Sequence, residues 1–356
     1  MTSSFSIYLD LVRFQAALLV YLFHIGYYSG ARIPAIGNLG SESVLVFFVL
    51  SGFVIAYSSS KKHVAFKDFV IARLARLWSV MLPALVLTML ADSIGQYLNL
   101  AAYAPLQPYS TFKWLASSVI NFAFLGQMWN LKISPGTNGP FWSIAYEFWF
   151  YALFAASIYF NGLQRIILCL ACSFVAGPKI IMTYPIWYFG VVTYRKLSSV
   201  DNVPFTVGLS LWISSVLLGL LYFSLNGPQF LEEAFPALLD ISKMQWRVNF
   251  LPESLLLAIL IVVNLYGAWI ISKSIHEIQK SIAVIIKLGA DTSFGLYLFH
   301  YPIILLCKAV FLPLSDSYNS MYIIIMYTLP LTFSIYIALV CEKYKEIYKN
   351  CLNFIR

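Results

Sequence analysis

Two ionisable side chains lie on one face of the first long apolar segment of this chain, Tyr8 to Tyr28. Arg13 and His24 are eleven residues apart. On an α-helix they fall within roughly 20° of the same face, about 16 Å apart along the axis. A membrane-spanning helix gains no stability from such groups, so they are candidates for a functional site that faces a polar interior. Histidine can act as a base near neutral pH, because its unperturbed pKa is about 6.5.

Three carboxylates stand near this pair in sequence or in expected depth. Asp10 precedes Arg13 by one helical turn, where it can neutralise the guanidinium. Glu42 opens the second apolar segment, and Glu147 lies more than a turn inside the fourth. A buried carboxylate needs a partner, and we expect Glu147 to pair with His24, which lies at a similar depth. The alternative is that Asp10 and Arg13 pair at the interface and His24 caps the outer headgroup zone, while Glu42 is a solvated group at the outer interface.

A pair of arginines follows the second apolar segment, in the amphipathic stretch from Lys61 to Trp78. Arg73 and Arg76 are one helical turn apart, and their forked donors suit phosphate oxygens. The alternative is that they anchor the chain to the cytosolic leaflet. His300, in the middle of the ninth apolar segment, is equally compatible with a catalytic role or with a core hydrogen bond to a neighbouring helix.

The composition predicts an all-α, polytopic integral membrane protein. Of its residues 60% are hydrophobic and only 11% charged, whereas a soluble domain carries roughly a quarter charged residues. Trp114 to Met128 could add a re-entrant eleventh segment, and Asp291 to Ser293 are expected to cap the ninth span. We predict about ten spans, of which the fifth and sixth are short, near residues 8–28, 41–59, 78–100, 138–160, 164–177, 183–194, 204–225, 250–271, 290–312 and 321–341.

Charge placement orients these spans. Lysine and arginine concentrate on the segments that lie inside if both termini are cytosolic, which follows the positive-inside rule. The net charge of +8 therefore reports topology and does not indicate a nucleic-acid partner. We expect one transmembrane domain over residues 1–345 and a short cytosolic tail over 346–356. The five cysteines form no disulfide framework and no metal site is expected.

Five motifs in register resemble the acyltransferase-3 family. Any one of them alone is weak, but together they cover nearly the whole membrane domain. The position where the family often has an aspartate is Leu45 here. The motifs are Arg13 with His24, FFVLSGF at 47–53, Arg73-x-x-Arg76, WSxxxE at 142–147 followed by Phe150-Tyr151, and SFGLYLFHYP at 293–302.

The resemblance implies a membrane O-acyltransferase that moves an acyl group, by analogy acetyl, from cytosolic acyl-CoA to a hydroxyl of an extracytoplasmic carbohydrate. Acyl-CoA is then a co-substrate, no cofactor stays bound, and the location is a bacterial cytoplasmic membrane. Many members carry an appended esterase-like domain, which we do not expect here. The oligomeric state, the glycan and its modified position stay open.

The resemblance and the residue placement together assign candidate roles. His24 is the expected general base and Glu147 its orienting carboxylate, although His300 stays open as an alternative base. The expected supporting residues are Asp10, Glu42, His300, Trp142 and Ser143, of which the last two are candidate oxyanion donors. Arg13, Arg73 and Arg76 are expected to bind the acyl-CoA donor.

A different class of function is also compatible with buried charge. In a proton-coupled transporter or flippase, Asp10, Arg13, His24 and Glu147 would form a proton relay. Such a relay does not require paired arginines on an amphipathic cytosolic segment, so the arginine pair favours the enzyme.

Overall fold

The computed structural model describes residues 2–33, 39–60, 64–106, 110–197, 202–234, 251–275, 277–315 and 319–354. Within these ranges the secondary structure is entirely helical. The α-helices are α1 (Ser3–Ser29), α2 (Gly40–Ser60), α3 (Phe66–Leu98), α4 (Thr111–Phe122), α5 (Trp142–Tyr159), α6 (Gly162–Ala176), α7 (Pro178–Leu197), α8 (Phe205–Ser224), α9 (Gly227–Ala234), α11 (Leu251–Ser272), α12 (Lys280–Phe311) and α13 (Asn319–Phe354); the short 3-10 helices are η1 (Leu100–Leu106), η2 (Gly139–Phe141) and η3 (Leu312–Leu314).

The helices group into two compact units, and several of them contribute to both. The first unit comprises residues 1–16, 44–64 and 170–289, and the second comprises 17–43, 65–169 and 290–356. Helix α1 therefore supplies its first half to one unit and its second half to the other. The two units are described separately below.

Close helix contacts hold the first unit together at glycines. A Cβ atom on Gly52 of α2 would overlap the backbone carbonyl of Trp187 in α7, and one on Gly190 would overlap that of Val49. Small residues allow membrane helices to approach closely, since packing rather than the hydrophobic effect drives their association. Gly52, in the middle of α2, therefore marks a close contact between α2 and α7.

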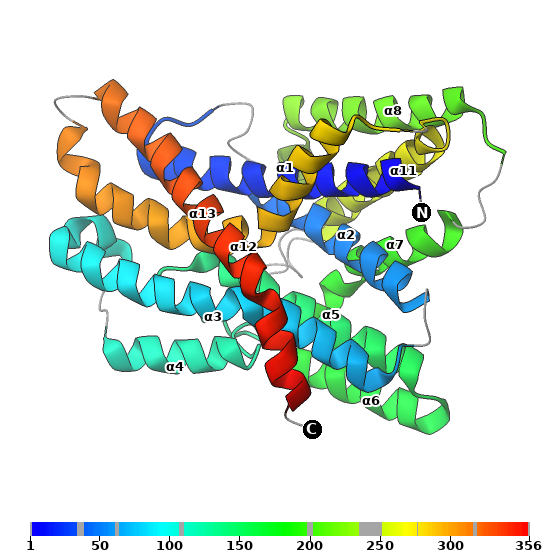
Figure 1. The fold of residues 1–356 in the computed structure, drawn as a ribbon, viewed down its shortest axis with the longest axis horizontal. Coiled ribbons are helices and arrows are strands. Elements are labelled where there is room, and N and C mark those ends of the chain that lie inside the picture. The colour runs from blue at the N-terminus through cyan, green and yellow to red at the C-terminus, as the bar shows by residue number, and fades with distance from the viewer. Residues whose placement is uncertain are drawn as a thin grey trace. The chain divides into compact units, whose positions relative to one another are not determined.

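A polar network joins three helices of the same unit. The indole Nε1 of Trp212 (α8) donates to the Tyr8 hydroxyl at 2.9 Å, and that hydroxyl donates to the side-chain carbonyl of Asn264 (α11). The Asn264 amide nitrogen in turn donates to Ser215 Oγ at 3.0 Å. Such interhelical hydrogen bonds satisfy polar groups where no water is present. Helices α8 and α11 lie side by side along this contact (Figure 1).

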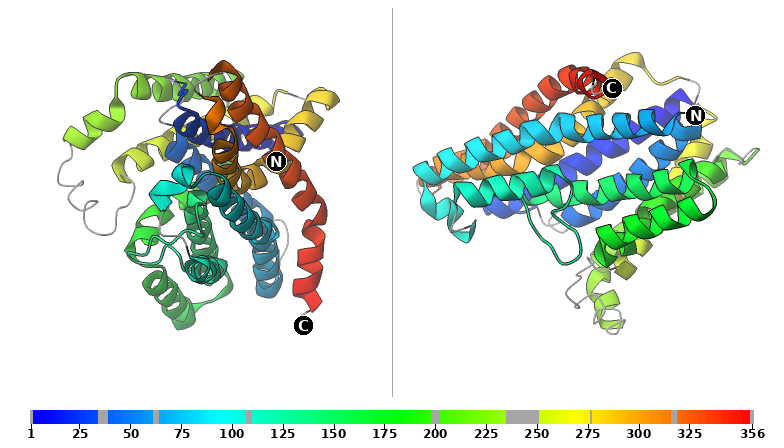
Figure 2. Two further views of the ribbon diagram at one scale, coloured as in Figure 1. Left: turned by 90° about the vertical axis from the view of Figure 1, so that its left-hand side faces the viewer. Right: turned by 90° about the horizontal axis from the view of Figure 1, so that it is seen from below.

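The second unit is built around α3, a helix of 33 residues. Helix α13 packs across it, and α4 and α5 pack along it (Figures 1 and 2). The amphipathic stretch that precedes the third span is thus the beginning of the same helix, because no glycine interrupts residues 66–94 and Pro83 is accommodated within it. Likewise α12 begins at Lys280, so Asp291 to Ser293 lie inside the helix; the expectation that they cap it is wrong.

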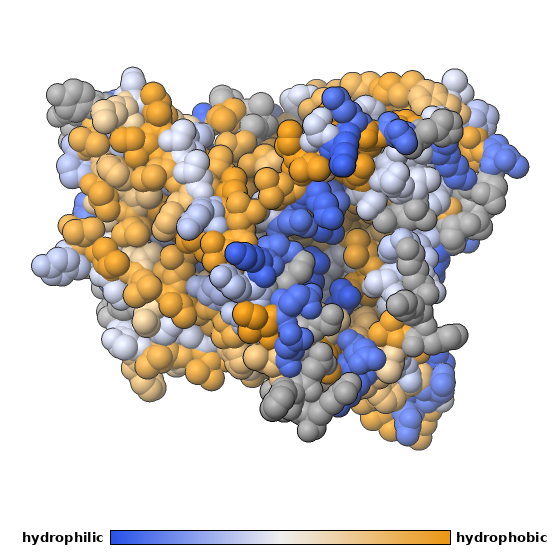
Figure 3. Space-filling model, in the orientation of Figure 1, coloured by the Kyte–Doolittle hydropathy of each residue, from blue (hydrophilic) through white to orange (hydrophobic). Residues whose placement is uncertain are grey.

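The outer face of the second unit is apolar. Helices α3, α4 and the first half of α13 present mainly hydrophobic side chains in the space-filling view (Figure 3). Exposed residues on these helices include Val86, Leu90, Ile94, Leu115, Val119, Ile324 and Phe333. A soluble protein rarely exposes so large an apolar surface, so this face is suited to contact lipid.

The all-α polytopic class is confirmed. Within the described ranges eight helices are long and apolar enough to cross a membrane, or nine if the pair α6 and α7, bent by 118°, counts as one span. The sequence predicts ten because it counts 164–177 and 183–194, which fall on these two helices, as separate spans. Helix α4 has only 12 residues, too few to cross a bilayer.

We predict that Gly190→Ala destabilises the fold. The added Cβ overlaps the Val49 carbonyl, and overpacking of this kind costs about 1–3 kcal/mol. Thermal unfolding of the purified protein in detergent should show a lowered midpoint. The matched control is Gly219→Ala in α8, where a Cβ meets nothing within 4 Å. If both variants shift the midpoint alike, the close α2–α7 contact does not govern stability.

Candidate functional site

A pair of histidines from α1 and α12 lies in the second unit. The Nε2 atom of His300 lies 3.0 Å from the Nδ1 atom of His24. Each histidine also points Nδ1 at the carbonyl one turn earlier in its own helix: His24 at Val20, at 3.0 Å, and His300 at Leu296, at 2.8 Å. His300 has no exposed surface, whereas His24 is half-buried. The structure thus brings together the two histidines that the sequence left as alternative bases.

Tyrosine rings border the histidine pair. Tyr301 packs edge-on against His24 at a centroid distance of 5.0 Å, and its hydroxyl lies 2.5 Å from that of Tyr28. The ammonium group of Lys308 lies over the Tyr28 ring at 5.4 Å. These aromatic groups pack around His24 and help to hold it in place.

Glu147 and the arginine pair form a second polar cluster. The Tyr151 hydroxyl donates to the Glu147 carboxylate one turn away on α5. Arg73 lies within electrostatic reach of both Tyr151 and Glu147, and Arg76 acts on Tyr151 as well. The expected pairing of Glu147 with His24 stays a prediction; the hydrogen bond described for this carboxylate is to Tyr151, and Arg73 lies within electrostatic reach of it.

Both arginines rest on aromatic rings of the second unit. The Arg73 guanidinium lies 5.7 Å from the ring centre of Phe69, and that of Arg76 lies 5.9 Å from Phe294. The Nε atom of Arg73 is buried and donates to no acceptor in the part of the chain that the structure describes. Arg76 is exposed. A buried guanidinium donor beside an exposed one can bind the oxygens of an anion.

Ser143 and Tyr297 lie between the two clusters. Ser143 Oγ donates to the Tyr297 hydroxyl at 2.9 Å, and that hydroxyl donates to the carbonyl of Pro140 at 3.1 Å. Tyr297 is within electrostatic reach of Glu147, and its ring centre lies 6.4 Å from that of His300. The Ser143 proton is therefore engaged by Tyr297, so an oxyanion role for Ser143 would require this hydrogen bond to break.

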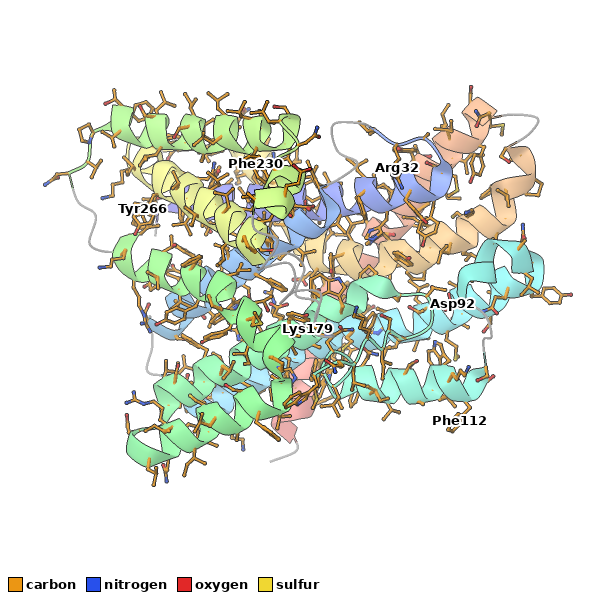
Figure 4. The ribbon with its side chains drawn as sticks, turned by 180° about the vertical axis from the view of Figure 1, so that it is seen from behind. Arg32, Asp92, Phe112, Lys179, Phe230 and Tyr266 are labelled. Carbon is orange, nitrogen blue, oxygen red and sulfur yellow. The ribbon has the colours of Figure 1, made fainter. Side chains whose placement is uncertain are left out.

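A buried carboxylate fixes the segment that leads into α5. Asp92, near the end of α3, accepts hydrogen bonds from the backbone N–H and the hydroxyl of Thr137, at 2.9 and 2.7 Å (Figure 4). The neighbouring Asn138 amide donates to Thr88 Oγ1 at 3.0 Å and to the Leu298 carbonyl at 2.9 Å. These bonds tie α3, the start of α5 and α12 together at the level of the histidines.

The remaining sequence candidates are placed as follows. Asp10 and Arg13 lie in the first unit, where their side chains form an ion pair of 4.0 Å, as expected. Glu42 is in the first turn of α2 and half-buried. The Trp142 ring packs edge-on against Tyr146. No group of three or more His, Cys, Asp or Glu side chains that could hold a metal gathers anywhere in the described ranges.

The sequence analysis missed three contributors to this site. Asp92 carried a signal, because a lone acid inside an apolar span is a functional or structural marker. Tyr151 and Tyr297 lie within two of the five motifs but were assigned no role, since the hydroxyl partners of a tyrosine depend on how helices pack.

The comparison with protein families gives one match. A family model described as an acyltransferase domain matches residues 6–340, nearly the whole chain. No curated protein and no solved structure matches the chain.

We predict that Asp92→Asn loosens the start of α5. An asparagine would turn an amide NH2 toward one of the two Thr137 donors, leaving a buried donor unpaired at a cost of about 1–3 kcal/mol. The unfolding midpoint should fall. Asp68→Asn, an exposed acid on the same helix, is the control and should leave it unchanged. Equal midpoints for the two variants would show that Asp92 does not anchor this segment.

Proposed function

The chain belongs to the acyltransferase-3 family and is a multi-pass membrane protein, and from this premise we propose that it transfers an acyl group from acyl-CoA to a carbohydrate hydroxyl. We propose acetyl as the acyl group, an extracytoplasmic glycan as the acceptor and a bacterial cytoplasmic membrane as the location. These finer assignments rest on the five family motifs and on the charge distribution of the sequence.

The observation that carries the proposal is a polar path through the second unit. It begins at Arg73 and Arg76, continues through Tyr151 and Glu147 to Tyr297, and ends at His300 and His24. Intramembrane polar residues are costly and mark functional pathways. This path has cations at one end and an imidazole base at the other. It therefore suits acyl-CoA, a long molecule whose phosphates lie at one end and whose thioester lies at the other.

The arginine pair is the proposed binding site for the CoA phosphates. Arg73 lies at the second turn of α3, about 22 Å along the helix from Thr88, which stands at the level of the histidines. An extended pantetheine arm would bridge this interval. In this proposal Tyr151 and Glu147 orient the Arg73 side chain, whereas the sequence predicts that Glu147 orients His24. The donor-binding role expected for Arg13, which lies in the first unit, stays a prediction.

The proposed reaction is a direct transfer at His24. The imidazole takes the proton of the acceptor hydroxyl, and the oxygen attacks the thioester carbonyl. The carbon–sulfur bond breaks, the acyl group becomes an ester of the glycan, and CoA leaves as the thiolate. The protonated imidazole then returns its proton to the thiolate or to water. A base positioned in this way contributes about 10²–10⁴ in rate.

We predict that His24→Ala leaves a folded but nearly inactive protein. Release of CoA thiol in proteoliposomes supplied with acetyl-CoA and a glycan should fall by about 10²–10⁴-fold, because the base is lost. Size-exclusion chromatography and the unfolding midpoint check that the variant is folded. Retention of wild-type acylation would refute the role of His24 as base.

We predict that Arg76→Gln weakens donor binding. Loss of a charge-assisted hydrogen bond worth about 1.5–3 kcal/mol should raise KM for acetyl-CoA about 10-fold or more, with a smaller effect on kcat. With acetyl-pantetheine, which lacks the nucleotide phosphates, the variant and the wild type should perform equally.

The matched control for that experiment is Arg165→Gln, an exposed arginine on α6. This control variant should change neither the KM for acetyl-CoA nor the KM for acetyl-pantetheine. If Arg76→Gln is as impaired with acetyl-pantetheine as with acetyl-CoA, the arginine does not act on a phosphate and the donor assignment fails.

A further inference from the structure

The hydrogen-bond partners of His300 determine which of its nitrogens carries the proton. Its Nδ1 atom faces the carbonyl of Leu296 at 2.8 Å. A carbonyl oxygen only accepts hydrogen bonds, so Nδ1 must donate. In the neutral ring the other nitrogen, Nε2, is then a lone-pair acceptor. It points at His24 Nδ1 at 3.0 Å.

The same reasoning determines the proton on His24. Its Nδ1 atom faces two acceptors, the Val20 carbonyl at 3.0 Å and His300 Nε2. Nδ1 therefore carries the hydrogen, and the lone pair of neutral His24 resides on Nε2. In the described part of the chain, His24 Nε2 makes no hydrogen bond. The basic nitrogen of His24 is thus left available for a substrate.

Resting on the acyl transfer proposed above, we infer that His300 is a positioning residue that, together with the Val20 carbonyl, holds His24 in the tautomer whose Nε2 is the base. Protonation of Nε2 creates an imidazolium, and its Nδ1–H then donates a charge-assisted hydrogen bond to His300 Nε2. The arrangement follows the logic of a triad, in which the base is oriented by a third group. Here that group is a neutral imidazole, itself held by a backbone carbonyl.

His300 is poorly placed to be the base. It has no exposed surface, and the rings of Tyr21, Tyr297 and Tyr301 lie at centroid distances of 6.2–6.4 Å around it. Both of its nitrogens are engaged, one by Leu296 and one by His24. His300 also cannot pass a proton onward, because the group that its Nδ1 atom faces, the Leu296 carbonyl, cannot exchange a proton.

The first test compares two amides at position 300. In His300→Gln the side-chain oxygen can occupy the place of Nε2 and accept from His24, whereas the shorter amide in His300→Asn reaches only the place of Nδ1. His300→Asn should lower kcat about 10²-fold, since a base in the wrong tautomer loses most of its contribution. KM for both substrates should stay within about two-fold, and His300→Gln should recover most of kcat.

Two outcomes would overturn the inference. If Gln is as inactive as Asn, His300 supplies a proton-transfer function that an amide cannot replace. If both variants keep full kcat, the contact with His24 has no catalytic consequence. Combining His300→Asn with His24→Ala adds a further check: the double variant should be no slower than His24→Ala alone, because His300 acts only through His24. If the double variant instead lost kcat by the product of the two single-variant effects, the inference would be contradicted.

A spectroscopic test separates this inference from the proposed function. Nitrogen NMR of histidine-labelled protein, assigned with the single variants, should show His24 protonated at Nδ1 in the wild type. His300→Asn leaves only the Val20 carbonyl to hold the Nδ1 proton and should therefore let the two tautomers mix. A wild-type protein that shows this tautomer but transfers no acyl group would refute the proposed function alone. A His24 protonated at Nε2 would refute the positioning role, whatever the activity.

Discussion

Water is absent from the hydrocarbon layer of a membrane, so a polar side chain on a spanning helix has to find its partners on neighbouring helices. This constraint organises the second unit. His24 is matched by His300, Glu147 by Tyr151, and Asp92 by Thr137. The first pair joins α1 to α12, the second lies within α5, and the third ties α3 to the segment that precedes α5. The groups proposed for chemistry are therefore also structural ties.

The same constraint separates the site into an arginine end, near the start of α3, and a histidine end. Arginines are stabilised where aromatic rings and the Glu147–Tyr151 pair surround them, near the start of α3. Neutral imidazoles tolerate the drier interior, where the N–H group of each ring faces a hydrogen-bond acceptor. Tyr297 lies within electrostatic reach of Glu147, and its ring centre is 6.4 Å from that of His300, so it links the two regions. The resulting arrangement fits a reaction whose charged donor group and reactive carbonyl are far apart in one molecule.

Much of this arrangement could be predicted from sequence. The apolar segments predicted an all-α membrane fold, because this class depends on local composition. The fifth and sixth spans could not be counted correctly, since only the structure shows that α6 and α7 are bent by 118°. The start of α3 was misjudged because amphipathicity changes at Trp78 while the helix continues.

The pairing of the charged groups was harder to predict. Depth along a helix places Glu147 near His24, but rotation about the helix axis decides which neighbour a side chain meets. That rotation is set by packing with several helices at once; it leaves Glu147 within electrostatic reach of Arg73 and brings His300 to His24. The Asp10–Arg13 ion pair could be predicted because both residues belong to one helix.

The central claim is that this membrane protein moves an acyl group from a thioester to a glycan hydroxyl. The most direct measurement quantifies CoA thiol and O-acyl ester together, using purified protein in sealed vesicles with acyl-CoA and glycan on opposite sides. The account predicts equal amounts of both products, formed only when His24 is present. Passage of the glycan across the vesicle membrane without release of CoA would contradict it and identify a carrier.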